Sequence, residues 1–169
     1  ISRYEAGINV QRTSGNRSTD GKTMISPLSV PNVYPYNNIT VSQAKDLSEK
    51  MYSGKSHLMT NAAWDRTLGW IIQTTNNVNL SDVILDSKGW GNYSDSSFNA
   101  TGTGNLAKTG AFGDSTKVNN IYDLAGNVYE FTSAQNADTR IGEVYRGGYF
   151  TNTGSITPAS IREGQPHDS

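Results

Sequence analysis

The sequence contains no cysteine among its 169 residues. This absence excludes disulfides, thiolate nucleophiles and thiolate metal sites. The net charge is −1, and no run of Lys or Arg occurs that would attract nucleic acid or an anionic membrane. No apolar stretch approaches the roughly 20 residues that span a bilayer. We therefore predict no nucleic-acid partner and no membrane insertion.

Apolar and charged residues are both scarce, at 34% and 17%. Asn, Ser, Thr and 17 Gly make up the difference, and such residues favour turns and left-handed backbone. The length suits one domain with a hydrophobic core. We predict a single, loop-rich domain over residues 1–169. Because the chain opens without Met on a strand-like segment, we expect it to be a piece of a longer protein.

The clearest predicted helix begins after Thr40. Thr40 is a favourable N-cap, and Gln43 follows three residues later, which completes a capping box. Apolar residues recur at helical spacing after the cap, and Gly54 ends the pattern. The apolar stripe comprises Val41, Ala44, Leu47 and Met51.

A second helix is predicted to start near Thr60. Gly69 lies inside it and costs about 1 kcal/mol relative to Ala. We therefore expect Gly69 to pack closely against a neighbouring element. The apolar face comprises Trp64, Leu68, Ile71 and Ile72.

Residues 76–119 show no sustained periodicity and are rich in turn residues. A long irregular segment in a small domain is usually functional or held by ligands. The later segments "IYDLAGNVYEFTS" and "VYRGGYF" are short and strand-like. The pattern predicts an α+β domain with two early helices, a small antiparallel sheet and abundant coil.

The stretch "DLAGNVYE" places Asp123 and Glu130 around a Gly-Asn turn. Ca²⁺ prefers several oxygen ligands, including carboxylates and the carbonyls that tight turns expose. The spacing is equally consistent with Asp123 capping a turn and Glu130 as a solvated strand residue. Both interpretations stay open on spacing alone.

Arg146 is followed by two glycines inside a strand-like pattern. Paired glycines in a strand indicate a bulge or the close approach of another backbone segment. We interpret Arg146 as a buried ion-pair or stacking residue, with Glu130 and Glu143 as its candidate partners.

The segments "IYDLAGNVYEFTS" and "VYRGGYF" resemble the signature of the formylglycine-generating enzyme/sulfatase-modifying factor family. "RYEAG", "YNNITVSQAKDLSEKM" and "SHLMTNAAWDRTLGWI" match further parts of that family in order. The resemblance extends from Arg3 to Arg162. It implies a variant of the C-type lectin fold, with short strands, two helices and ordered coil.

The resemblance also bears on chemistry. The family's oxidases hold copper with two late cysteines, and related sulfoxide synthases bind iron through three histidines. This chain has no cysteine and two histidines, and neither histidine position fits. We therefore predict a non-catalytic protein. The resemblance implies a structural Ca²⁺ site whose ligands are the Asp123 and Glu130 side chains and the Gly126 and Val128 carbonyls.

The chain is also similar to the C-type-lectin-fold variable proteins of diversity-generating retroelements, which bind receptors on cells. It departs from their usual motif at Tyr129 and Phe131, where Trp is common. By this resemblance, residues 145–169 would form a display segment, and tyrosines with small polar residues suit such surfaces. The candidate contact residues are Tyr145, Tyr149, Asn152, Thr153, Ser155, Arg162 and His167.

The predicted function is therefore the recognition module of a phage tail or bacterial surface protein. We expect an extracellular domain that forms part of a larger assembly, as a homo-oligomer, and that binds a cell-surface protein or glycan receptor. One alternative is an enzyme of the family with altered chemistry, which a deep pocket with converging titratable groups would favour. Another is a structural decoration domain of a virion.

Family members usually finish with a Gly-Phe-Arg strand, which this sequence lacks before Ser169. Two explanations stay open, a truncated chain or a different closing element. A sheet without that strand would expose an edge.

Overall fold

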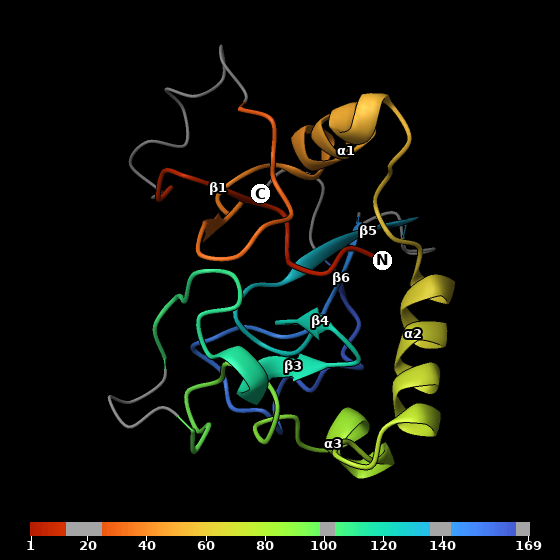
Figure 1. Ribbon diagram of the computed structural model, residues 1–169. Helices are drawn as coiled ribbons and strands as arrows, with labels where there is room; N and C mark the ends of the chain where they lie inside the picture. Colours follow the sequence, from red (N-terminus) through yellow and green to blue (C-terminus); the bar gives the residue numbers. More distant parts are fainter. Residues whose placement is uncertain (13–24, 99–103, 136–142, 165–169) are drawn as a thin grey trace.

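The computed structural model describes residues 1–12, 25–98, 104–135 and 143–164. Within these ranges the chain is a mixed α+β structure with α-helices α1 (Val41–Lys50), α2 (Asn61–Thr74) and α3 (Leu80–Ile84). Figure 1 shows α1 at one end of the molecule and α3 at the other, with α2 along the side between them. The predicted α+β class is confirmed, and one helix more than predicted is present.

Three small antiparallel sheets accompany the helices. β1 (Gly7–Ile8) pairs with β2 (Tyr34–Pro35), and β3 (Lys117–Val118) pairs with β4 (Ile121–Tyr122). The third sheet has the order β5-β6-β7 and comprises β5 (Glu130–Gln135), β6 (Glu143–Arg146) and β7 (Glu163–Gly164). β7 pairs along the edge of β6.

Helix α1 begins as its sequence predicts. The Thr40 hydroxyl accepts the Gln43 backbone N–H at 3.2 Å, and the Gln43 side chain accepts the Thr40 N–H at 3.0 Å. Ala44 and Leu47 are buried. A 3₁₀ turn, Met51–Ser53, follows, and Gly54 ends it with φ +79°. The predicted capping box and the glycine stop are both confirmed.

Helix α2 also starts at its predicted cap, where the Thr60 hydroxyl accepts the Ala63 N–H at 3.0 Å. Its buried residues, Trp64, Leu68 and Ile71, belong to the predicted face. The prediction for Gly69 is wrong, because no atom lies within 4 Å of the place where its Cβ would stand.

Helix α3 was not predicted from the sequence. The Asn79 side chain accepts the N–H groups of Ser81 and Asp82, and the Asp82 carboxylate accepts the Asn79 N–H at 2.8 Å. The helix has five residues, too few for hydrophobic periodicity to reveal it. The capping pattern Asn-x-x-Asp was its only readable signal.

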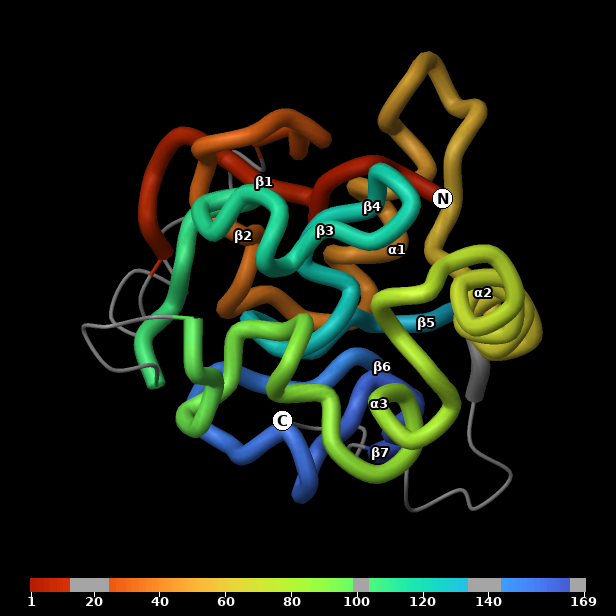
Figure 2. The backbone as a smooth tube through the Cα atoms, turned by 60° about the horizontal axis from the view of Figure 1, so that its bottom comes forward, coloured from red at the N-terminus to blue at the C-terminus, as the bar shows by residue number. Residues whose placement is uncertain are grey.

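The hydrophobic core lies between α2, α3 and the coil, and it includes residues from the two helices and from the coil. The Trp64 indole N–H donates to the Ala159 carbonyl at 3.0 Å, and the Ser160 N–H donates to the Val83 carbonyl at 3.2 Å. Figure 2 shows the last part of the chain, in blue, close to α3. The buried cluster comprises Trp64, Leu68, Ile71, Val78, Val83, Trp90, Tyr93, Val118, Ile121, Leu124, Ala125 and Ala159.

None of the helices in the described ranges combines the length and apolar character needed to traverse a bilayer. The longest of them, α2, has 14 residues.

Candidate functional site

Asp123 fastens the irregular coil to the segment before β5. Its Oδ2 accepts the Gly110 backbone N–H at 2.6 Å, and its Oδ1 accepts the Thr116 hydroxyl at 2.7 Å. The side chain is 2% exposed. Burial raises the pKa of Asp123, while the two hydrogen bonds oppose that rise. Asp123 therefore holds residues 110 and 116 in place, close to the turn-capping role considered above.

Asn127 is the most connected polar side chain of the motif, and it is fully buried. Its Oδ1 accepts from Asn92 Nδ2 at 3.0 Å and from the Ala107 N–H at 2.9 Å. Its Nδ2 donates to Glu5 Oε2 at 2.8 Å and to the Ala107 carbonyl at 3.2 Å. One amide thus joins the N-terminal segment, the middle coil and the late motif. Asp123 and Asn127 are called the pinning cluster below.

Two glycines of the late motifs are required by close backbone approach. A Cβ on Gly126, which has φ +73°, would lie 2.4 Å from the Asn92 carbonyl oxygen. A Cβ on Gly148, which has φ +92°, would lie 2.3 Å from the Thr157 carbonyl oxygen. The predicted close approach at the paired glycines is confirmed.

Arg146 is buried, as predicted, but the prediction that it pairs with Glu130 is wrong. Its Nη2 donates to Asp65 Oδ1 at 2.6 Å, and the guanidinium carbon lies 5.7 Å from the centre of the Trp64 ring. The side chain of Glu143, the other candidate, lies outside the described part of the structure. Because Asp65 pairs with Arg146, the charge of Glu130 is left without this partner.

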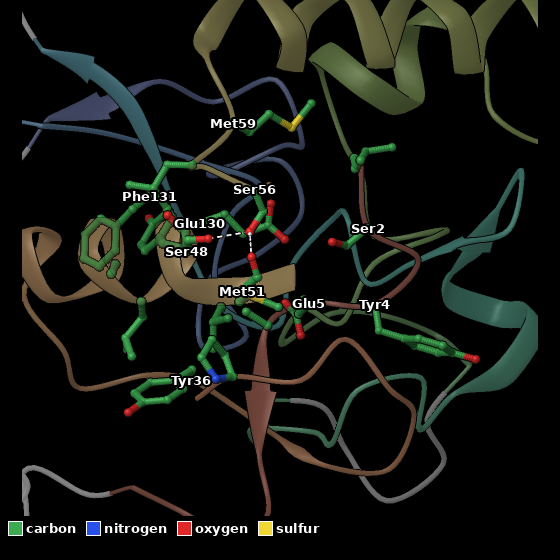
Figure 3. A pocket seen from close by; sticks show the side chains of 18 of the residues that line it. Ser2, Tyr4, Glu5, Tyr36, Ser48, Met51, Ser56, Met59, Glu130 and Phe131 are labelled. Carbon is green, nitrogen blue, oxygen red and sulfur yellow. Dashed lines mark hydrogen bonds between the residues drawn. The ribbon is translucent and has the colours of Figure 1, made fainter. Parts of the chain in front are cut away.

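A pocket of about 1110 Å³ lies beside α1. Its wall combines the N-terminal segment, α1 with the loop that follows it, and the beginning of β5. Figure 3 shows Glu5 and Glu130 among the side chains that line it. The volume is in the range of small-molecule sites.

Glu5 lines this pocket, and one of its two carboxylate oxygens accepts a hydrogen bond from Asn127. It is 7% exposed, and its Oε1 has no hydrogen-bond partner among the described residues. Burial raises the pKa of Glu5 well above its usual range, and the negative charges of Asp123 and Glu130 add to the rise. The hydrogen bonds from Asn127 and Val128 oppose it. No local pattern singles out Glu5 beyond its place in "RYEAG".

Glu130, the first residue of β5, is the second acid of the pocket. Burial, followed by the charge of Asp123, raises its pKa from an ordinary value of 4.5 to about 8. No described residue donates a hydrogen bond to its carboxyl group. Glu5 and Glu130 are called the pocket acids below.

The predicted Ca²⁺ ligands are only partly brought together. Asp123 and Glu130 are close enough to interact electrostatically, but both Asp123 oxygens already accept hydrogen bonds from the protein. Within the described ranges, no three His, Asp or Glu side chains form a group that could hold a metal ion. The bound calcium stays a prediction.

Stacked aromatic rings form another part of the pocket wall. The ring centroids of Tyr129 and Tyr149 are 5.6 Å apart at 7°, and those of Tyr129 and Tyr145 are 5.4 Å apart. The Phe131 and Tyr145 centroids are 5.3 Å apart. Burial raises the pKa of Tyr129, and its hydrogen bond to Glu163 adds to the rise. Tyr129, Phe131, Tyr145 and Tyr149 are called the aromatic wall below.

The predicted contact residues fall into different surroundings. Tyr145 is 8% exposed, so it faces the pocket rather than an open surface. Tyr149 is half-buried at the same pocket. Asn152 is half-buried, and its side chain donates to the Tyr129 hydroxyl at 3.3 Å.

Of the remaining contact candidates, Thr153, Ser155 and Arg162 do not line the pocket. Thr153 and Ser155 share a turn, with their hydroxyl oxygens 3.1 Å apart. Arg162 is exposed and forms an ion pair with Asp65. His167 lies outside the described residues.

A scan against protein-family models and a search of curated proteins found no match for this chain.

Proposed function

We propose that this chain is a non-catalytic binding domain with a C-type-lectin-like fold of the formylglycine-generating-enzyme type. Helices α1 and α2 precede a long coil, which contains the short helix α3, and the late motifs hold that coil by the hydrogen bonds of the pinning cluster. This arrangement is the one that the motif resemblance implies, and it supports the proposed fold. Comparison of an experimental structure of this chain with structures of that family tests the proposed fold.

The observation that carries the proposed function is the open pocket with its aromatic wall. Tyrosine rings provide rigid contact area, and their hydroxyl groups provide hydrogen bonds. The proposed ligand is a cell-surface protein or glycan receptor. The domain would act outside the cell, on a phage tail or a bacterial surface, within a larger assembly of several copies.

Binding to bacterial cells and to a panel of glycans and surface proteins tests the proposal. Tyr149→Ala removes a pocket ring, whereas Ser155→Ala changes an exposed residue outside the pocket lining. We expect Tyr149→Ala to weaken receptor binding by roughly tenfold or more, with little change from Ser155→Ala. Equal effects of the two substitutions would contradict a ligand in the pocket.

The pocket acids support a second candidate, an enzyme with altered chemistry. A carboxyl group with a pKa of about 8 is protonated near neutral pH and is suited to general acid catalysis. Turnover assays with thiol-containing peptides test this candidate. Turnover that Glu130→Gln abolishes would replace the binding proposal.

A further inference from the structure

The pocket acids are two carboxyl groups from distant parts of the sequence that face one space (Figure 3). Glu5 is 7% exposed, and its Oε1 is unpartnered in the described structure. A buried carboxylate oxygen without a hydrogen-bond donor is energetically unfavourable. Native structures satisfy most such groups, so a buried, unpartnered oxygen on a side chain that lines a pocket marks a candidate contact for a ligand.

The charges around the pocket favour a cation. Glu5, Glu130 and Glu163 line it, and Lys55 and His57 are the basic side chains that line it with them. Lys55 and His57 are both exposed. Arg146 stands opposite Glu130 in the sheet register, but its guanidinium group pairs with Asp65. A cation that enters the pocket favours the ionised form of these acids with raised pKa, so that the ionised acids and the cation attract one another.

The size and the aromatic wall indicate which kind of cation fits. A volume of about 1110 Å³ is far larger than a metal ion requires. The stacked rings of Tyr129 and Tyr149 lie in the same wall. Ring faces attract ammonium and guanidinium groups, most strongly where water is excluded.

We propose that this pocket binds the ammonium or guanidinium group of an organic ligand, with Glu5 and Glu130 as its counter-charges and the aromatic wall as its second contact. The inference rests on the proposed binding function and adds the chemical class of the ligand. The carboxyl groups of Glu5 and Glu130, which both line the pocket, accept the donors of the cationic group.

Calorimetric titration of the purified chain with matched probes tests this inference. The cationic probes are N-acetyl-lysine amide and N-acetyl-arginine amide, and N-acetyl-norleucine amide and N-acetyl-citrulline amide are their neutral counterparts. The buffer has low ionic strength and contains a chelator, so that metal ions do not compete. Glu130→Gln removes one counter-charge, and Glu49→Gln, an exposed change on α1 outside the pocket lining, is the matched control.

We expect saturable binding of a cationic probe and at least roughly tenfold weaker binding of its neutral counterpart. Glu130→Gln should lower the affinity by a similar factor, and Glu49→Gln should leave it unchanged. Equal binding of cationic and neutral probes by the unmodified chain would overturn the inference without recourse to any variant. In a separate titration, Ca²⁺ is added alone. If Ca²⁺ binds tightly and then prevents the cationic probe from binding, the inference is overturned in favour of a metal.

The outcome separates this inference from the proposed function. If Tyr149→Ala abolishes receptor binding but no cationic probe binds, the ligand class is wrong and the binding pocket stands. If a cationic probe binds as expected but Tyr149→Ala leaves receptor binding unchanged, the proposed receptor-binding function is wrong.

Discussion

The pinning cluster and the pocket acids are neighbouring polar groups that differ in their hydrogen bonding. The side chains of the pinning cluster are fully hydrogen-bonded, and those of the pocket acids are not. Asp123 uses both carboxylate oxygens, and Asn127 uses its carbonyl oxygen and its amide nitrogen, all toward protein partners. Glu5 leaves Oε1 without a described partner, and Glu130 receives no hydrogen bond from a described residue. The difference teaches that saturated polar groups hold the coil, while unsaturated groups are open to a ligand.

Breaking the centre of the pinning cluster should have the largest effect. Asn127→Ala removes four hydrogen bonds and leaves several buried partners unsatisfied. We expect a loss of about 3 kcal/mol or more in the free energy of unfolding, measured by urea denaturation. Asn77→Ala, at an exposed position, is the control and should change stability little. A loss below about 1 kcal/mol for Asn127→Ala would show that the coil does not depend on it.

Neutralising one acid of each group sharpens the comparison. Asp123→Asn keeps the shape but loses the charge and one acceptor oxygen, so we expect a loss of about 2 kcal/mol. Glu130→Gln removes a charge that burial disfavours, so stability at neutral pH should rise or stay unchanged. Urea denaturation of the two variants side by side measures the contrast. Equal destabilisation would erase the distinction between the two groups.

Calcium addition and removal test the resemblance-based metal prediction. A cation that binds only the folded protein raises its stability by mass action. If the predicted ligands assemble around Ca²⁺, the thermal midpoint should rise by a few degrees when Ca²⁺ replaces a chelator, and Glu130→Gln should remove that rise. An unchanged midpoint in the unmodified chain would contradict the predicted site.

The smallest expected effect is at Gly69, which belongs to neither the pinning cluster nor the pocket acids. It serves as a reference for the stability changes expected in those two groups. Gly69→Ala places a methyl group where no atom lies within 4 Å, so only helix propensity should change. We expect a gain of about 1 kcal/mol in the free energy of unfolding. A loss would reveal packing at Gly69 and restore the original sequence prediction.

Local sequence signals predicted the two longer helices, α1 and α2. Thr40 with Gln43 and Thr60 defined the starts of α1 and α2, because a capping hydroxyl acts within one turn. α3 is too short for periodicity, although its cap at Asn79 was readable. The roles of Asn127 and Glu5 depend on contacts between residues 122 positions apart. No local pattern contains such a contact, so the candidate site became visible only in three dimensions.

The most direct test is the pH dependence of stability in the unmodified chain and in the Glu5→Gln/Glu130→Gln double variant, without metal. Both acids have a pKa above its ordinary value in the folded protein, so the folded state binds protons more tightly than the unfolded chain. The free energy of unfolding should therefore be highest below about pH 4.5 for these groups and fall as the pH rises toward about 8. The double variant should show a clearly smaller fall over this range. Matching curves for the two proteins, or a stability that rises over this range because of these acids, would contradict the claim that the pocket acids are buried without a counter-charge and are open to a ligand.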